Sequence, residues 1–492
     1  MNYKISLALL MIAASFITYG QNQEDALRYS RLFPSGSARH MGMGGAMGSV
    51  GADMSMLGYN PAGIGLYRSS EFAFTPFLSL FNTDAVFQGE TRDDNRYGLG
   101  LGQLGAVFVR DLSQKESASP WKMVQFGISL NRINHFNNRI WIEGFNNNSS
   151  MMTGYVHMAD GTRPENLNRF DTKLAYDALL IWETDPIDLL YDTDAYRGGI
   201  NQMKTISTGG SMNEVLFSLG ANYNDRLYLG ASLGIPYIRY SSEIVYRETD
   251  TRNQIDAFNQ FERIENLETR GTGFNLKFGA IFRATDWLRL GGAIHTPTFF
   301  PSMSDSWRSR MSSDLVIDNE SVQKSVSSPE GSFDYELTTP FRAIGSATVL
   351  FGNIGLISAD YELIDYSEAR LNSDDYKFFD ANSAIRANYT SSHNFRFGTE
   401  WRLNELYFRG GYAIFGSSYQ EGVNNDAGSQ YSLGIGVREK GYFIDLGFVS
   451  NRFSEDRFLY WVPTGDGYDF ELPRSSIDFS RRLFLLTFGW RF

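Results

Sequence analysis

The last ten residues of the chain, 483–492, constrain its fold more than any other segment. Every second side chain in this segment is apolar, and most of these are aromatic: Phe484, Leu486, Phe488, Trp490 and Phe492. The other face, followed from just upstream, is cationic or small: Arg481, Thr487, Gly489 and Arg491. A period of two predicts a β-strand, because successive side chains of a strand point to opposite sides of a sheet. The same alternation recurs along most of the chain and predicts an all-β protein.

The composition favours a barrel that spans a membrane. Of the 492 residues, 15% are aromatic and 48 are glycine, yet the mean hydropathy is only -0.29. In a transmembrane barrel the lipid-facing and lumen-facing residues alternate, so their hydropathies average out. The net charge of -12 argues against a nucleic-acid partner. The absence of Cys excludes disulfides, a lipidated cysteine anchor and thiol catalysis.

Residues 1–20 are predicted to be a signal peptide. Lys4 precedes a continuous apolar run, 5–17, which is too short to span a bilayer as a helix. Small residues at positions 18 and 20 suit cleavage before Gln21. We therefore expect an exported protein.

A glycine-rich segment, 21–70, precedes the first predicted strand. Gly42-x-Gly44 has the start of a phosphate-loop spacing, but Met47 stands where the next glycine is required and no Lys-Ser/Thr pair follows. The small residues instead predict a compact segment that packs inside something else. Asn60-Pro61 is a turn signal that keeps its neighbours out of a helix.

Two motifs in this segment resemble a known family. Residues 36–46, Gly-Ser-Ala-Arg-His-Met-Gly-Met-Gly-Gly-Ala, and residues 59–63, Tyr-Asn-Pro-Ala-Gly, resemble the N-terminal hatch of the FadL/TodX family. Members of that family carry long-chain fatty acids or aromatic hydrocarbons across the bacterial outer membrane. The Asn-Pro-Ala motif of the family falls on Asn60, Pro61 and Ala62. The resemblance implies a barrel of fourteen strands with an N-terminal plug (hatch) in its lumen, located in the bacterial cell outer membrane.

From residue 71 onward, alternation and turn residues predict about fourteen antiparallel strands. They are 71–80, 97–111, 123–136, 213–223, 226–247, 271–284, 286–298, 332–350, 354–371, 393–403, 406–416, 429–438, 442–460 and 478–492. From the fourth strand on, short and long connections alternate, as in a barrel with periplasmic turns and extracellular loops. The longest predicted loops are 137–212, 248–270 and 299–331. We expect the barrel, 71–492, to hold the segment 21–70 as a plug, because a bore of this size is otherwise open.

An enzyme on the same architecture is one alternative. A hydrolase needs a nucleophile, a base and an orienting group within hydrogen-bond reach. The histidines are instead dispersed among plug, strands and loops: His40, His135, His157, His295 and His393. An acidic run lacks the central Gly and the final Glu of a calcium loop: Asp185, Asp188, Asp192 and Asp194. We therefore predict no catalytic residue, no metal and no cofactor.

A fatty-acid carrier needs an apolar slot that ends in a cation for the carboxylate. Four cations face the lumen by parity, and one histidine shares the face of Arg289, which gives five candidate ligand-binding residues: Lys277, Arg289, His295, Arg396 and Arg409. Pairing with lumenal acids such as Glu400 or Asp445 is the alternative role for these cations.

In the segment 137–212, apolar residues at helical spacing predict either a packed loop helix or an exposed groove that collects an apolar ligand: Leu167, Phe170, Leu174, Tyr176, Leu179, Leu180 and Trp182.

The predicted function is passive uptake of a hydrophobic small molecule such as a long-chain fatty acid, gated by the plug. Burying about ten methylenes at roughly 0.8 kcal/mol each gives about 8 kcal/mol, which corresponds to micromolar binding. The resemblance implies exit sideways through the barrel wall beside a kinked strand, and 234–236, Gly-Ile-Pro, is our candidate for the kink. The predicted partners are this ligand and outer-membrane lipid, and the barrel is predicted to be a monomer.

Two other functions stay open at this point. A FadL-like barrel can bind or shuttle another protein as part of a secretion system, and its extracellular loops would then contact that protein. Such a role would also account for the large segment 137–212. A haem-uptake barrel is the third hypothesis, and the scattered histidines do not favour it.

Overall fold

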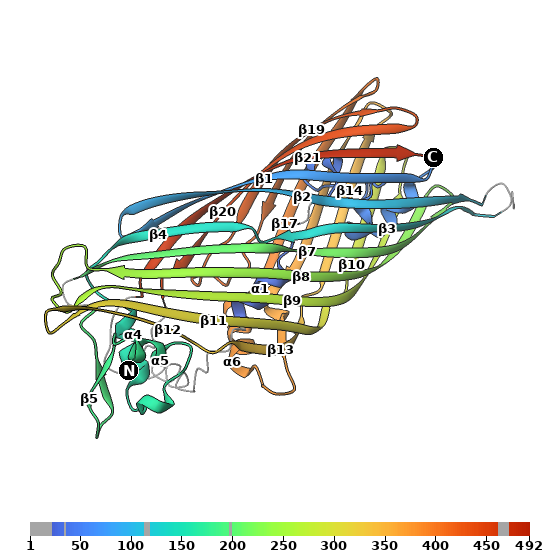
Figure 1. The fold of residues 1–492 in the computed structure, drawn as a ribbon. Helices are drawn as coiled ribbons and strands as arrows, with labels where there is room; N and C mark the ends of the chain where they lie inside the picture. Colours follow the sequence, from blue (N-terminus) through green and yellow to red (C-terminus); the bar gives the residue numbers. More distant parts are fainter. Residues whose placement is uncertain (1–21, 34–35, 113–118, 196–198, 461–471) are drawn as a thin grey trace, which may run out of the picture.

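Antiparallel strands form a barrel that closes where the first strand meets the last (Figure 1). β1 (Glu71–Phe87) pairs with β21 (Arg474–Arg491) in a register that sets Glu71 opposite Arg491. The computed structural model describes residues 22–33, 36–112, 119–195, 199–460 and 472–492. The predicted signal peptide lies outside these ranges. Within them, no helix has the length and apolar character needed to cross a membrane.

The barrel has fourteen strands, three of which are interrupted. β3 (Trp121–His135) is continued by β4 (Asn138–Asn146), β10 (Leu288–His295) by β11 (Phe299–Ile317), and β13 (Gly331–Thr338) by β14 (Arg342–Phe351). The others are β1, β2 (Glu90–Asp111), β7 (Ile200–Tyr223), β8 (Leu227–Thr249), β9 (Phe258–Arg283), β15 (Gly355–Asp365), β17 (Ser391–Leu403), β18 (Leu406–Phe415), β19 (Gly428–Arg438), β20 (Tyr442–Phe458) and β21. Short strands β12 (Glu320–Ser327) and β16 (Arg370–Asn372) extend the same sheet.

The predicted all-β barrel and its strand order are confirmed, but several strands are longer than predicted. β1 and β2 form one long hairpin where a connection at 81–96 was expected. Most of the predicted loops 248–270 and 299–331 is strand, because β9 begins at Phe258 and β11 and β12 run through the second loop. These strand ends project beyond the lipid, where the outer face meets water, so the apolar outward residues that mark a membrane strand are missing there.

The outer surface of the barrel carries a belt of exposed apolar side chains. On β9, the alternate residues Phe274, Leu276, Phe278 and Phe282 are all exposed. Aromatic rings also stack across neighbouring strands, such as Phe74 on Phe488 with 5.3 Å between ring centroids. A continuous exposed belt of this kind is unfavourable in water and favourable against lipid. The barrel therefore spans a membrane.

The N-terminal segment lies inside the barrel as a plug. It contains α1 (Gln23–Ser30), α2 (Ala38–Gly42), α3 (Met56–Tyr59) and the 3-10 helix η1 (Pro61–Leu66). Helix α2 contacts β18 to β21, whereas η1 contacts β3, β7, β8 and β9 on the other side of the ring. Almost every residue from 36 to 65 is buried. The plug thus touches the wall on opposite sides and fills the bore between them.

The segment between β4 and β7 folds as a cap on the extracellular end. It contains α4 (Met151–Ala159), the 3-10 helix η2 (Pro164–Asn166), α5 (Thr172–Asp177) and a hairpin of β5 (Trp182–Asp185) and β6 (Leu190–Asp192). Most of its apolar residues, Leu167 and Leu174 among them, are buried against the strand ends, whereas Leu179 and Trp182 are exposed. The buried carboxylate of Glu248 in β8 accepts hydrogen bonds from the Met151 amide, at 2.9 Å, and from the Ser150 hydroxyl. The helical spacing in 137–212 therefore marks packed helices.

Candidate functional site

Glycines line the wall where the plug touches it, and they bring the two backbones into direct contact. A Cβ atom on Gly42 of the plug would lie 3.1 Å from Cα of Gly434 in β19. On the wall, a Cβ atom on Gly411 in β18 would collide with the backbone of Gly44. Because these positions carry no side chain, the backbones of plug and wall lie in direct contact. Other wall glycines face the plug in the same way: Gly220, Gly230, Gly279, Gly398 and Gly447.

The motif Asn60-Pro61-Ala62 rests on the opposite wall, against β8 and β9. Asn60 Nδ2 donates a 2.6 Å hydrogen bond to the carbonyl oxygen of Gly48, and Asn60 Oδ1 accepts one of 3.2 Å from the Ala62 amide. Pro61 opens η1, a position that suits its fixed φ and missing N–H. A side chain at Gly230 in β8 would collide with Pro61. The motif therefore fixes both the local fold of the plug and its seat on the wall.

A chain of buried ion pairs joins the plug to the facing wall. Arg39 of α2 contacts Glu400 in β17 through two hydrogen bonds, each 2.8 Å long. Glu400 also accepts a 2.6 Å hydrogen bond from Arg409, which pairs with Asp445 at 2.7 Å. Asp445 in turn pairs with Arg438 at 2.9 Å. Removing either acid would leave a buried arginine without its counter-charge, which costs roughly 3–5 kcal/mol.

A buried histidine sits beside these charges in the plug. His40 lies in α2, and its Nδ1 atom has no hydrogen-bond partner among the described residues. Burial, opposed by the Asp53 carboxylate and assisted by Arg396 and Arg39, lowers the pKa of the His40 imidazole to about 4. The docked plug therefore holds this histidine neutral.

The five predicted ligand-binding residues all lie at the lumen, where the plug or an acid already contacts each of them. Lys277 forms an ion pair with Glu214. Arg289 Nη1 donates a 3.0 Å hydrogen bond to a backbone carbonyl of the plug, and His295 Nε2 lies 2.9 Å from the carbonyl oxygen of Tyr59. Arg409 belongs to the buried chain of ion pairs described above. The structure does not bring the five together into one site.

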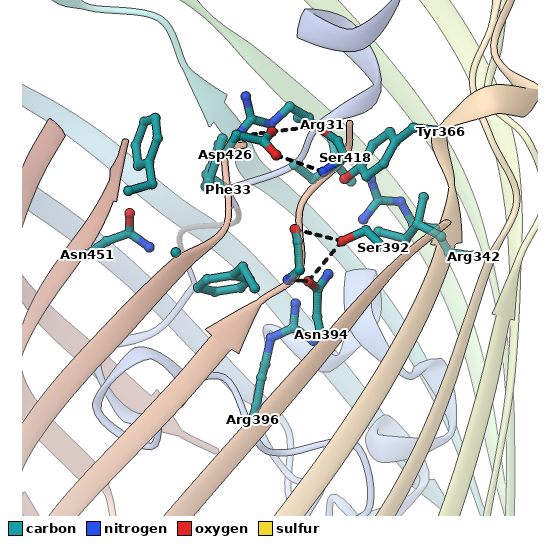
Figure 2. A pocket seen from close by; sticks show the side chains of 16 residues that line it. Arg31, Phe33, Arg342, Tyr366, Ser392, Asn394, Arg396, Ser418, Asp426 and Asn451 are labelled. Atoms are coloured by element: carbon teal, nitrogen blue, oxygen red, sulfur yellow. Dashed lines mark hydrogen bonds and ion pairs between the residues drawn. The ribbon is translucent and has the colours of Figure 1, made fainter. Parts of the chain in front are cut away.

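Arg396 borders a small polar cavity between the N-terminal segment and the wall (Figure 2). The cavity has a volume of about 40 Å³, which is room for a few waters only. Two of its three arginines, Arg396 and Arg342, share the carboxylate of Glu362, at 2.6 and 3.2 Å. The third, Arg31, pairs with Asp426 at 2.9 Å. An alkyl chain does not fit in this cavity while residues 31–33 occupy their present position.

In the described part of the barrel wall, β2 and β4 meet at a seam without a backbone ladder. β2 pairs with β3 only from Gln103 to Asp111, whereas β4 pairs with β7. Among the described residues, the extracellular part of β2 and the whole of β4 form no backbone ladder with each other, although they lie side by side (Figure 1). Side chains bridge the seam instead. Arg92 pairs with Glu143 at 3.1 Å, and Arg139 with Asp94 at 3.2 Å.

The inner side of the seam is lined by aromatic rings and cations. His135, at the end of β3, stacks on Phe81 at 5.6 Å between centroids and packs edge-on against Phe77. Arg132 lies over the Phe77 ring, and Arg481 lies 4.9 Å from the centroid of the Phe81 ring. Arg481 in β21 is buried and forms no ion pair with any described residue, and its Nε atom has no hydrogen-bond partner among them. The seam thus combines an apolar lining with a cation that lacks a counter-charge.

The N-terminal segment contacts β3 at the seam. The Phe33 amide donates a 3.0 Å hydrogen bond to the carbonyl oxygen of Ile133, and the Tyr29 ring packs edge-on against Phe136. The β3–β7 register shifts between Arg132 and Asn134, which marks the irregularity in this strand. A movement of residues 29–33 would therefore change the support of the strand end at the seam.

The sequence-based candidate for the kink, 234–236, lies within a continuous strand. β8 runs without interruption through 234–236, where only its pairing with β9 lapses at two residues. Pro236 explains the lapse, since proline has no N–H for the ladder. Of the three interruptions in the wall strands, the one between β3 and β4 lies at the seam. A sequence signal for it exists in 134–138, Asn-His-Phe-Asn-Asn, because asparagines of this density favour turns over strand.

Comparison with known proteins supports the architecture. No protein-family model and no curated protein sequence matches this chain. Its fold is similar to the crystal structure of a FadL homologue from Pseudomonas aeruginosa, with a TM-score of 0.56, 13% identity, and coverage of 93% of this chain and 99% of the other. The toluene transporter TodX from Pseudomonas putida gives a TM-score of 0.52 at 12% identity, covering 94% and 99% of the two chains. The toluene transporter TbuX from Ralstonia pickettii gives 0.50 at 14% identity, covering 93% and 99%.

At these identities the likeness establishes the fold and leaves the ligand open. The barrel closes with fourteen strands, a plug precedes the first of them, and the lipid-facing belt surrounds the whole. The chain therefore has the fold of the FadL homologue and of TodX, a membrane-spanning β-barrel with an N-terminal plug.

Proposed function

We propose that this protein is a passive channel, and no enzyme, for hydrophobic small molecules that carry a carboxylate, such as long-chain fatty acids. The observation that carries the proposal is Arg481, a buried guanidinium without an acidic partner among the described residues, over the ring of Phe81. A buried cation of this kind is stabilised when an anion binds, and guanidinium groups match carboxylates well. The rings of Phe77 and Phe81 offer the adjoining apolar surface.

The proposed path leads from the lumen through the seam between β2 and β4. An axial path past residues 37–66 is blocked, because plug and wall touch backbone to backbone. The seam is held only by side chains in its extracellular half, so it opens at a smaller cost than a hydrogen-bonded ladder. Withdrawal of residues 22–33 would release the end of β3 and would also enlarge the cavity beside Arg396. In this scheme the residues predicted to bind ligand divide into two groups. Arg396 becomes exposed when residues 22–33 withdraw. The others hold the plug or the wall in place: Lys277, Arg289, His295 and Arg409.

The motif Asn60-Pro61-Ala62 has the role of a fixed anchor in this proposal. It keeps residues 37–66 of the plug on the wall while residues 22–33 move. Substitution of Pro61 by Ala is then expected to lower uptake while the barrel still assembles. Unchanged flux in that variant would show that the seat of the plug does not matter for transport.

The proposal is tested by ligand binding to purified wild-type protein and to the Arg481→Gln variant. The probes are palmitate and its methyl ester, which differ only in the charge of the headgroup. We expect palmitate to bind roughly tenfold or more weakly to Arg481→Gln, because a charged hydrogen bond contributes about 1.5–3 kcal/mol. Binding of the ester is expected to stay unchanged. Equal loss of both ligands, or of neither, would contradict a carboxylate site at Arg481.

A second function, binding of another protein, is favoured by one observation. The β5–β6 hairpin of the cap leaves Ile187 87% exposed, with Leu190 and Trp182 also at the surface. Large exposed apolar side chains on a fixed hairpin are typical of contact surfaces. Gentle purification followed by mass spectrometry separates the two functions. A co-purifying fatty acid supports transport, and a stoichiometric polypeptide lost on Ile187→Asp supports protein binding.

A further inference from the structure

A polar groove lies on the outer surface of the barrel, beside the extracellular half of the seam. Its volume is about 430 Å³, within the range of roughly 300–1,000 Å³ that small-molecule pockets occupy. Four strands contribute to its lining: β2, β4, β7 and β8. The lining residues are Asn95, Arg96, Arg139, Thr205, Ser207, Glu243 and Val245.

Alternation along the strands shows that the groove faces outward. Ile206 in β7 and Tyr246 in β8 are buried against the cap inside the barrel. Their neighbours Thr205, Ser207 and Val245 must therefore point to the outside. Arg96 reaches across the seam onto this outer face, where Nη1 donates hydrogen bonds of 3.1 Å to Ser207 Oγ and 2.7 Å to the carbonyl oxygen of Thr208.

The groove lies immediately beyond the lipid-facing belt. On β2, the next outward residues from Asn95 toward the periplasm are Tyr97 and Leu99, which are 71% and 83% exposed. On β7, the outward residues Phe217 and Leu219, farther toward the periplasm, are exposed as well. Acyl chains pack on such apolar residues and end where the polar residues begin. The groove is thus at the level of the lipid headgroups in the outer leaflet.

The polar groups of the groove match a phosphorylated headgroup. Arg96 has no ion pair among the described residues, and the guanidinium of Arg139, though paired with Asp94, is 54% exposed. Guanidinium groups bind phosphate oxygens in a forked geometry, and hydroxyls such as those of Thr205 and Ser207 add donors. Glu243 forms no ion pair with a described residue, so its carboxylate is available for a hydroxyl or ammonium group of the same headgroup.

We propose that this groove binds the phosphorylated headgroup of an outer-leaflet membrane lipid, with its phosphate on Arg96 and Arg139 and its acyl chains along Tyr97 and Leu99. The site is independent of the transported ligand. It joins β2 to β7 and β8 at the seam, where β2 and β4 have no backbone ladder among the described residues. A ligand that binds the closed seam and not the open one stabilises closure, so a lipid in the groove seals the wall.

The proposal is tested with the full-length protein in detergent, to which single lipids are added before native mass spectrometry. The probes are lipid A and phosphatidylglycerol, which carry phosphate, and an uncharged diacyl glycolipid, which does not. We expect both phosphorylated lipids to remain bound at a fraction of detergent that strips the uncharged one. Equal retention of all three lipids would overturn the proposal. Displacement of the lipids by millimolar inorganic phosphate alone would show a free-phosphate site and would also overturn it.

Variants locate the binding in the groove. Arg96→Gln combined with Arg139→Gln is expected to weaken retention of lipid A at least tenfold, whereas Arg270→Gln, a matched change at an exposed arginine of the neighbouring β9, leaves it unchanged. Arg96 also bridges the seam, so a second variant, Thr205→Glu, places a carboxylate on the groove floor without removing any of the seam contacts described above. Retention unaffected by Thr205→Glu would contradict the site even if the double variant failed to assemble.

Discussion

The side-chain amide of Asn134 in β3 donates a 2.9 Å hydrogen bond to the backbone carbonyl of Arg31 in the plug. This bond joins the N-terminal segment to the strand at its register shift, next to the seam. Arg31 itself is held from the other side by Asp426. The two residues therefore connect residues 22–33 of the plug to the end of β3. These are the two parts of the molecule that move in the proposed path.

Breaking this bond is expected to loosen both parts together. In Asn134→Leu the Arg31 carbonyl loses its partner, at a cost of about 1 kcal/mol. We expect faster amide hydrogen exchange in residues 29–33 and 132–138, with no change in residues 37–66. Asn131→Leu, also on β3 but below the shift, serves as the control for a general effect on the strand. Faster exchange confined to one of the two segments would mean that they are not coupled.

The backbone contact between plug and wall gives a prediction for single glycines. In Gly411→Ala the new methyl group would collide with Gly44, so the plug cannot dock in its present position. Gly410→Ala is a matched control, because its methyl group would meet only Thr399 Cγ2, at 3.8 Å. Both barrels should still show the shift in gel mobility that folded barrels give before heating. Limited proteolysis should release plug peptides from Gly411→Ala alone, and equal resistance of both variants would refute the close fit.

The buried cations at the lumen are expected to contribute to stability more than to ligand affinity. Lys277→Met leaves Glu214 buried without its ionic partner, whereas Arg409→Met removes one of the two arginines that pair with each of Glu400 and Asp445. Lys277→Met should cost roughly 3–5 kcal/mol in unfolding free energy, measured by urea titration in detergent, and Arg409→Met should cost less, because Arg39 and Arg438 still compensate the two acids. Palmitate affinity, measured on protein that remains folded, should change less than threefold. A loss of affinity without a loss of stability would assign these residues to the ligand instead.

Acid is expected to loosen the plug through His40. Its pKa is about 6.5 in the unfolded chain and about 4 in the docked plug, so the docked form must stay unprotonated. The free energy that favours the docked plug is therefore at its maximum above about pH 6.5. It decreases as the pH drops toward 4, by at most about 3 kcal/mol. Hydrogen exchange of residues 37–50 should accelerate over this interval. His40→Gln should lack that part of the pH dependence, and an identical pH profile in this variant would exclude His40 as the cause.

The sequence predicts the barrel well because lipid imposes a simple rule on it. Inside the membrane every outward residue must be apolar, so strands such as β9 and β21 show their alternation plainly, and Asn60-Pro61-Ala62 marks the plug. Above the membrane the rule ends, which is why the upper parts of β9 and β11 were predicted as loops. The seam was missed for another reason. It depends on which strand lies beside β4, and side-chain bridges such as Arg92–Glu143 are long-range contacts that one sequence does not reveal.

The surroundings of Arg481 also could not be predicted from the sequence. Alternation places Arg481 on the inner face, but the sequence says nothing about the absence of an acid near it. Lys277 and Arg409 have the same parity, and both have acidic partners. Only the arrangement of Phe81, His135 and Arg481 in space distinguishes a cation that a ligand can use from cations that hold the wall together.

The most direct test of the account is to lock the seam. The chain has no cysteine, so Asp94→Cys with Arg139→Cys introduces one pair across β2 and β4 that a short thiol cross-linker can bridge. Ser241→Cys with Glu268→Cys, opposite each other in the continuous β8–β9 ladder, is the control pair. Uptake of labelled palmitate by cells should stop when the seam pair is bridged with a cleavable linker, and should return when the linker is cut, while the control pair has no effect. Uptake that continues at the normal rate through a bridged seam would contradict the lateral path.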